Sequence, residues 1–208
     1  MSYKFLDIAS TPSVCAAQAA NGSREMWERF KGHRTFDRFT DNEVAFIAAR
    51  DSFYMATVSE SGWPYIQHRG GPAGFLKVLD EKTVGFADFR GNLQYISVGN
   101  IAADDRVALI LVDYPNRARL KILAHVEVRD IEGDTELAER LALPGYKGKL
   151  ERAFLLHLET FDWNCPQHIT QRFTIEEIEA AVSPLQRRIA ELEAENLALR
   201  AQTSVQAG

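Results

Sequence analysis

Six short segments rich in β-branched and aromatic residues follow one another in the middle of the chain, and turn sequences separate them. They span 53–59, 65–70, 82–89, 107–113, 119–128 and 154–163. Short connections suit antiparallel neighbours, whereas parallel strands need long crossovers. The pattern therefore predicts a mainly β domain, a six-stranded antiparallel barrel with peripheral helices, rather than an alternating βα fold.

Three of these segments carry clear facing patterns. Apolar and polar side chains alternate along 119–128, which predicts one face on the core. The run 107–113 is apolar almost throughout and is typical of a strand buried on both faces. The inward residues expected for the last two strands are Leu120, Ile122, Ala124, Val126, Val128, Phe154, Leu156 and Leu158.

Helix signals lie outside these strands. Thr11-Pro12 predicts the start of a helix, with Thr11 as its cap. Thr40-x-x-Glu43 has the spacing of a capping box. Further expected helices span 41–50, 92–101 and 134–142. The predicted organisation is an N-terminal helical extension over 1–40, the barrel domain over 41–174 and a C-terminal helix over 175–208.

The C-terminal segment carries a heptad pattern behind a second capping box, Thr174-x-x-Glu177. Ile189 and Asn196 take position a, and Leu dominates position d, which favours a parallel two-stranded coiled coil. An amphipathic helix packed on its own domain is the alternative. The full seam is Ile178, Val182, Leu185, Ile189, Leu192, Asn196 and Leu199.

Two details refine the heptad prediction. In a parallel homodimer Arg188 would face Glu193, and Glu195 would face Arg200, so both pairs would attract. The dipeptide 183–184 is Ser-Pro, and a proline inside a helix removes a hydrogen bond. We therefore expect the helix to break there and restart.

Composition excludes several classes of protein. The net charge is −5, which disfavours nucleic acid or an anionic membrane as the main partner. No apolar run approaches the ~20 residues of a membrane span, and the first ten residues lack a signal-peptide pattern. Two cysteines make no disulfide framework. We expect a cytoplasmic protein with no membrane or nucleic-acid partner.

Two clusters suit an anionic or planar ligand. Arg90 and Asn92 lie where a strand turns into a helix, and exposed amides at a helix start bind anions. Gly70 and Gly71 end a strand, where the missing Cβ lets a flat ligand approach. The plainer alternatives are a surface arginine beside an Asn cap, and a bulge at a barrel corner.

Metal and cysteine chemistry are weakly supported. Cys165 and His168 have a Cys-x-x-His spacing, but two ligands do not make a zinc site. Nothing in the sequence indicates a lowered thiol pKa. His68, His125 and His157 are candidate haem ligands with no pattern to choose among them. We expect no metal site.

The order of ATVSESGWP, IQHRGGPAGFLKVLD, GFADFRGN, RVALILVDYPNRARLKILAHVEV and DWNCPQHI resembles the pyridoxamine 5'-phosphate oxidase-like proteins, the flavin-binding split-barrel superfamily. The resemblance covers roughly residues 40–175. It implies a six-stranded Greek-key split barrel, a homodimer, and FMN in two clefts along the subunit interface. A deazaflavin is the alternative cofactor within this superfamily.

The resemblance also implies roles for particular residues. Arg90 and Asn92 match the turn that grips the FMN phosphate, and Arg119 matches a position at the pyrimidine edge of the flavin. The stretch that lies along the phosphate, ribityl chain and ring is matched by His68, Arg69, Gly70 and Gly71. Trp163 and Gln167 match a C-terminal stretch that the opposite subunit contributes.

The chain also departs from the oxidase. Arg90-Gly91-Asn92 stands where that enzyme has a Ser-Arg-Lys type grip, and its C-terminal Arg-x-His type motif is not evident. We therefore expect an FMN-dependent oxidoreductase acting on an unidentified small molecule other than pyridoxamine phosphate. The alternatives are a non-catalytic module that binds FMN or haem for storage or sensing, and an interaction protein that recruits a partner through its coil.

Overall fold

The computed structural model describes residues 3–163 except 31–34, and residues 166–206. The chain divides into two compact units. The first comprises Met1–Asp113 and Arg117–Gln167, and the second comprises Tyr114–Asn116 and His168–Gly208. The candidate site lies in the first unit, and the heptad segment lies in the second.

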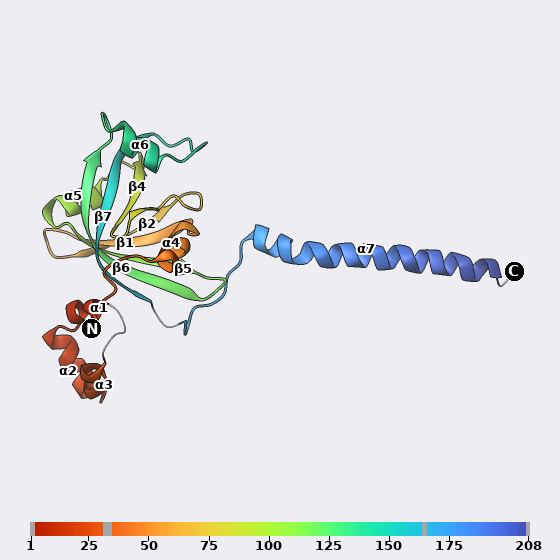
Figure 1. Ribbon diagram of the computed structural model, residues 1–208, viewed down its shortest axis with the longest axis horizontal. Helices are drawn as coiled ribbons and strands as arrows, with labels where there is room; N and C mark the ends of the chain where they lie inside the picture. Colours follow the sequence, from red (N-terminus) through yellow and green to blue (C-terminus); the bar gives the residue numbers. More distant parts are fainter. Residues whose placement is uncertain (1–2, 31–34, 164–165, 207–208) are drawn as a thin grey trace. The chain divides into compact units, whose positions relative to one another are not determined.

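The first unit is a split β-barrel built from one antiparallel sheet (Figure 1). Its sheet order is β2-β1-β5-β6-β7-β4-β3. The strands are β1 (Ser52–Val58), β2 (Pro64–Gly70), β3 (Lys77–Asp80), β4 (Thr83–Phe89), β5 (Arg106–Asp113), β6 (Ala118–Asp130) and β7 (Leu150–Trp163). The fold class is confirmed, but the strand count of six was wrong. The missed strand β3 has four residues, two of them charged, and is shorter than the usual five or six.

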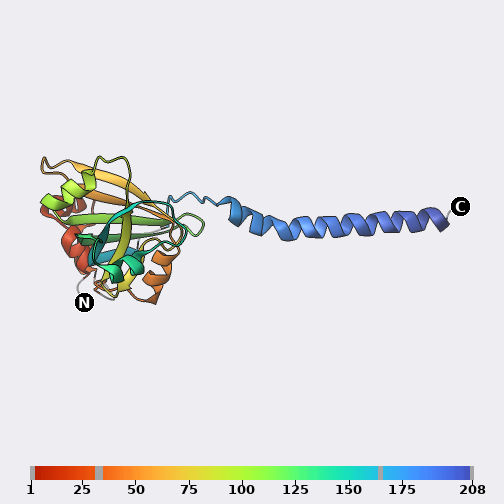
Figure 2. The same ribbon diagram turned by 90° about the horizontal axis from the view of Figure 1, so that it is seen from above.

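Aromatic side chains fill the barrel. Phe86 of β4 and Phe154 of β7 stack with ring centroids 5.0 Å apart, and Phe53 of β1 meets Phe86 edge-on at 5.4 Å. All three rings are almost fully buried. Figure 2 shows the strands of this unit curling into a barrel. The expected inward residues of β6 and β7 are buried or half-buried, except Val128, which is exposed.

The prediction that 107–113 is buried on both faces was wrong. In β5 only alternate residues are fully buried, while Ala108 is exposed and Ile110 is partly exposed. A barrel has one interior, so each strand can bury only one face in it. The outer face of β5 is therefore only partly covered by the described residues of the chain.

Helices surround the barrel. Each expected helix is present, as α2, α4, α5 and α6. The helix α2 begins at Pro12 with Thr11 as its cap, as predicted. The predicted capping box of Thr40 and Glu43 is formed at the start of α4. The start of α5 lies later than predicted, because residues 92–95 form a turn instead. The helices of this unit are α1 (Lys4–Ala9), α2 (Pro12–Ala20), α3 (Arg24–Arg29), α4 (Asp41–Ala48), α5 (Ile96–Ala103) and α6 (Thr135–Leu141).

The second unit consists mainly of the long helix α7 (Ile175–Gln206). Its capping box is formed, because Glu177 N donates to Thr174 Oγ1 at 3.2 Å and Thr174 N donates to Glu177 Oε2 at 2.8 Å. The predicted break at Ser183-Pro184 was wrong: the helix runs through Pro184, and Ser183 Oγ donates to Glu179 O at 2.7 Å. No described helix has the length and apolar character to cross a membrane.

Candidate functional site

The turn between β4 and α5 forms one wall of the candidate site. Leu93 and Tyr95 adopt φ angles of 65° and 52°, in the left-handed region that costs a non-glycine residue energy. Backbone strain of this kind concentrates at functional sites. The turn is stabilised by Asn92, whose Oδ1 accepts from Gln94 N at 3.1 Å and whose Nδ2 donates to Gln94 Oε1 at 3.0 Å.

A buried ion pair joins two strands that are not neighbours in the sheet. Arg69 of β2 donates through Nη1 to Asp88 Oδ1 of β4 at 2.5 Å, which brings β2 toward β4 across the split of the barrel. The Arg69 guanidinium also lies over the rings of Phe154 and Phe86, at 5.1 and 5.6 Å. Such cation–π contacts hold a guanidinium in place. Its Nε is buried and finds no hydrogen-bond acceptor in the described part of the chain.

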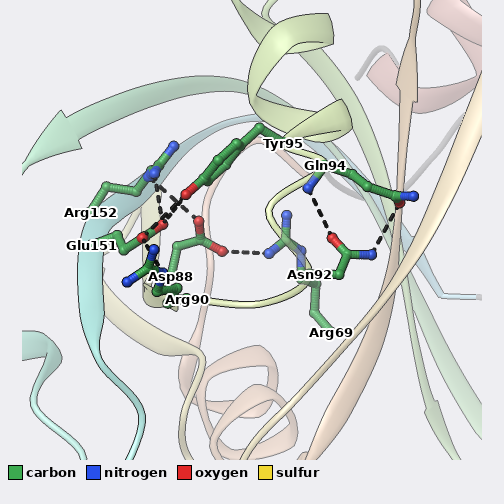
Figure 3. A network of polar contacts seen from close by, with 8 residues as sticks. All are labelled: Arg69, Asp88, Arg90, Asn92, Gln94, Tyr95, Glu151 and Arg152. Carbon is green, nitrogen blue, oxygen red and sulfur yellow. Dashed lines mark hydrogen bonds and ion pairs between the residues drawn. The ribbon is translucent and has the colours of Figure 1, made fainter.

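The ion pair continues into a network on β7 (Figure 3). Arg152 Nε lies 3.6 Å from Asp88 Oδ2, and Arg152 Nη2 lies 2.9 Å from Glu151 Oε2. Tyr95 donates its hydroxyl to the Glu151 carboxylate at 3.2 Å, and the Arg152 guanidinium lies 4.9 Å from the Tyr95 ring centroid. Asp88 is thus held between guanidinium groups from β2 and β7.

Arg90 occupies the edge of this network. Its Nε lies 3.7 Å from Glu151 Oε1, and its side chain is half exposed. The backbone is fixed by Arg90 N, which donates to Lys149 O at 2.8 Å. Three guanidinium groups therefore surround two carboxylates, so the cluster carries an excess of positive charge.

Burial dominates the titration of Asp88. It raises the pKa of that carboxyl above its ordinary value, while the guanidinium groups of Arg69 and Arg152 lower the pKa by less. Desolvation penalises the charged form of a carboxylic acid, and nearby cations favour it. The structural cause of the shift is that Asp88 itself is buried.

A cleft of about 250 Å³ opens beside the network. Arg69, Asp88 and Glu151 line it together with the turn and the first turn of α5, Ile96 to Val98. The first N–H groups of a helix have no acceptor within the helix and carry partial positive charge. The cleft therefore combines the start of a helix with the guanidinium group of Arg69, which suits an anion such as phosphate.

The two glycines of the predicted ligand approach have a packing role. A Cβ at Gly71 would lie 2.8 Å from two carbons of Phe75, which is buried in the core. At Gly70 a Cβ would lie 3.1 Å from His68 Cε1. The packing of Phe75 thus requires the absence of a side chain at Gly71, whereas at Gly70 the exposed His68 ring can move aside.

Replacing Gly71 with Ala is expected to lower the free energy of unfolding by about 1–3 kcal/mol, since overpacking forces the Phe75 ring to move. Urea denaturation measures the change. Gly91→Ala is the matched control, because a Cβ at Gly91 meets no atom within 4 Å. Equal stability of the two variants would contradict the packing role.

The other predicted site residues lie elsewhere. His68 lies on the opposite face of β2 from Arg69 and meets the ring of Tyr54 at 5.4 Å. Arg119 lies opposite Val112 near the start of β6. Trp163 ends β7, at the far end of that strand from Glu151 and Arg152. Gln167 lies in an exposed turn.

The indole of Trp163 is held by α4. Its Nε1 donates to Glu43 Oε1 at 2.7 Å, and its ring meets Phe46 edge-on at 4.7 Å. Asn164 and Cys165 of the DWNCPQHI stretch lie outside the described residues. Among the residues with described positions, no three His, Cys, Asp or Glu side chains are arranged to hold a metal ion.

Sequence reasoning missed four members of the network: Asp88, Tyr95, Glu151 and Arg152. Asp88 stands two residues before Arg90, near the end of β4, and its polar side chain inside an apolar segment was an available signal. Glu151 and Arg152 precede the predicted start of the last strand at residue 154, whereas β7 begins at Leu150. Only the tertiary fold brings β4 and β7 side by side.

Comparisons with known proteins place this geometry in context. The family model described as "Pyridoxamine 5'-phosphate oxidase" matches residues 39–155, which is more than half of the chain and includes most of the network. A search of curated proteins gave no match.

Similar solved structures include three bacterial proteins. A Lactobacillus delbrueckii protein named after pyridoxamine 5'-phosphate oxidase is 20% identical, with a TM-score of 0.48 over 61% of this chain and 94% of its own. HupZ of Group A Streptococcus is 16% identical, with a TM-score of 0.47 over 65% and 100%. An FMN-binding protein from Syntrophomonas wolfei is 16% identical, with a TM-score of 0.43 over 71% and 97%.

The family match covers the strands β1 to β6 and reaches into β7, and it includes Arg69, Asp88, Arg90 and Glu151. The resemblance seen in the sequence is thereby confirmed at the level of the family. The chain belongs to the pyridoxamine 5'-phosphate oxidase family.

Proposed function

We propose that this protein is an FMN-dependent oxidoreductase that acts on a small molecule as a homodimer. The observation that carries the proposal is the cleft at the start of α5, where Arg69 and the first turn of the helix lie together. FMN ends in a phosphate ester, and charge-assisted bonds from guanidinium groups are the strong contacts to phosphate. Membership of the family supports the same cofactor.

The residues of the cleft fit a phosphate. The buried Nε of Arg69 has no acceptor among the described residues, and a buried donor without a partner is costly. Arg90 has a half-exposed side chain beside Glu151, which lines the cleft, and the amides of Ile96 to Val98 begin a helix. Arg69 and the α5 amides would hold the phosphate, Arg90 would cover it, and Asp88 would fix Arg69.

The remaining predicted contacts are proposed to come from two subunits. His68, Arg119, Trp163 and Gln167 are retained as cofactor-binding residues together with Arg69, Gly70, Gly71, Arg90 and Asn92. Trp163 lies at the opposite end of β7 from Glu151 and the cleft. It would therefore contact the FMN that is bound in the cleft of the partner subunit. The cleft of about 250 Å³ is also below the 300–1,000 Å³ of a complete small-molecule site.

An exposed apolar face supports the homodimer. On the outer side of β1, β2 and β5, Ile66 is 63% exposed and Trp63 in the preceding turn is 76% exposed. Tyr54 and Val58 on β1 are also exposed, and Ala56, opposite Ile66, is partly exposed. Apolar patches of this kind on a folded protein mark interaction surfaces. His68 belongs to the same face, which would place it at the subunit interface.

FMN supplies hydride transfer when it is bound. The protein would supply position and electrostatics: Arg69 and Arg90 would anchor the phosphate end of the cofactor, and the Asn92–Gln94 hydrogen bonds would fix the turn before the helix. The ion pair with Asp88 would orient the Arg69 guanidinium. With two cysteines and no disulfide framework, the chain suits the reducing cytoplasm.

Arg90→Ala is expected to weaken FMN binding by about 1.5 kcal/mol, roughly tenfold in Kd. The value is at the low end for a charged hydrogen bond because the side chain is half exposed and screened by water. Quenching of FMN fluorescence during titration measures it. Arg38→Ala is the control, since that arginine pairs with Glu81 on an exposed surface. Identical affinity of both variants would remove Arg90 from the phosphate site.

Anaerobic mixing of the FMN-loaded protein with a reduced nicotinamide tests the activity. Bleaching of the flavin band, followed by its return on addition of an electron acceptor, is expected of an oxidoreductase. A protein that binds FMN tightly but never bleaches would instead be a storage or sensing module. If the protein binds a deazaflavin in preference to FMN, the proposed cofactor is wrong but the proposed phosphate site stands.

A further inference from the structure

The long helix α7 presents an apolar seam to solvent. Leu185 is 64% exposed, Ile189 is 57% exposed and Leu192 is 46% exposed. These residues are spaced alternately by four and three, which places them on one face of the helix. A helix with a continuous exposed apolar stripe is stabilised when a partner covers that stripe.

The continuity of α7 through Pro184 lengthens this seam. With Leu185 at position d, Val182 takes position a of the same heptad and Ile178 takes position d of the preceding heptad, and both are exposed. Pro184 falls at position c, on the outside, where its missing N–H does not disturb the seam. The seam from Ile178 to Leu199 therefore spans three heptads in one unbroken helix, the length at which a coiled coil becomes a sound assignment.

We propose that the partner of this seam is α7 of a second copy of the chain, bound parallel and in register. Charge complementarity selects this partner: Arg188 at g would meet Glu193 at e of the partner helix, and Glu195 would meet Arg200. Each of the two charge pairs occurs twice around the two-fold axis. A helix from a different protein would need matching charges at both pairs.

Asn196 selects the orientation. It is the one polar residue in the seam, at position a, between Leu192 and Leu199. In a parallel, in-register pair two Asn196 side chains meet and hydrogen-bond each other. In an antiparallel pair each amide would face an apolar residue and lose its partners in a buried site. The parallel dimer alone satisfies both the amides and the charges.

The inference goes beyond the proposed function, because the coil requires neither the cleft nor FMN. It adds a second dimer contact at a distinct part of the chain. Such a tether raises the effective concentration of one barrel for the other. The two barrels of one dimer would then stay together whether or not the cofactor is bound.

Disulfide trapping in the full-length protein tests the arrangement. Single cysteines are placed by Leu185→Cys or Leu199→Cys in a background in which Cys15 and Cys165 are replaced by Ser. In a glutathione redox buffer, each variant should give at least tenfold more covalent dimer than Ala194→Cys, a matched control at the outer position f. When the Leu185→Cys protein and the Leu199→Cys protein are mixed, few disulfides should join position 185 of one chain to position 199 of the other.

Other outcomes contradict the proposal. Cross-links only between positions 185 and 199 would show an antiparallel pair, and none above the Ala194→Cys level would show that a second copy does not cover the seam. Arg188→Glu should reduce the yield of covalent dimer, because two glutamates would then face each other. Adding Glu193→Arg restores an opposite-charge pair and should restore the yield, whereas a folding defect would not be repaired by it. FMN titration of the same variants is a separate readout, so failure of the coil and failure of the cofactor site are distinguishable.

Discussion

Arg69→Met is expected to weaken FMN binding by about 1.5–3 kcal/mol, or 10- to 150-fold in Kd. The side chain of Arg69 is largely buried and its guanidinium is held over two phenylalanine rings, so a bond from it to a phosphate would be little screened by water. Methionine preserves the aliphatic length of the side chain without its charge. Fluorescence titration with FMN measures the effect.

A double variant separates binding from folding. Arg69→Met alone leaves Asp88 beside one guanidinium instead of two, and breaking a buried pair destabilises the fold. Adding Asp88→Asn removes the uncompensated carboxylate, so stability should recover while FMN affinity stays low. Arg38→Met controls for the loss of a surface cation. Full FMN affinity in the folded double variant would exclude Arg69 from the phosphate site.

Glu43→Ala is expected to lower the free energy of unfolding by about 3–5 kcal/mol. The Glu43 side chain is fully buried and accepts hydrogen bonds from Trp163 Nε1 at 2.7 Å, Thr40 Oγ1 at 2.7 Å and Thr40 N at 3.0 Å. Its removal leaves three buried or partly buried donors without that acceptor. Urea denaturation followed by far-UV circular dichroism measures the loss.

Asp41→Ala is the matched control for Glu43→Ala. Asp41 is an exposed carboxylate in the same first turn of α4, so its removal costs only a helix-dipole contribution of about 0.3–1 kcal/mol. A loss at Glu43 no larger than at Asp41 would show that the buried network does not tie β7 to α4. The fixed position of Trp163 would then need another cause.

The barrel was predictable because its signals are local. Alternation along 119–128 and the capping residues Thr11 and Thr40 depend on neighbouring residues only, and the structure has these elements where they were expected. The apolar run of β5 does not reveal that its outer face is exposed. A strand face that another chain covers has the same apolar composition as one that the same chain covers. The helix α7 continues through Pro184, although a proline inside a helix normally kinks or ends it.

The candidate site was predictable in part. Arg69, Arg90 and Asn92 were named from the sequence, and the structure places Arg69 and Asn92 in the lining of one cleft, while Arg90 lies 3.7 Å from Glu151, which also lines it. The partners that orient them were missed, because Asp88 and Glu151 are far apart in the sequence and meet only through the pairing of β4 with β7. Gly71 has a close neighbour in Phe75, which sequence alone does not show.

The visible absorption spectrum of the purified protein, with mass spectrometry of whatever heat releases, tests the central claim most directly. We expect a flavin spectrum and released FMN, or the appearance of a tight complex when FMN is added to colourless protein. A Soret band would instead identify a haem-binding member of the fold. A colourless protein that also fails to bind added FMN would contradict the account of the cleft.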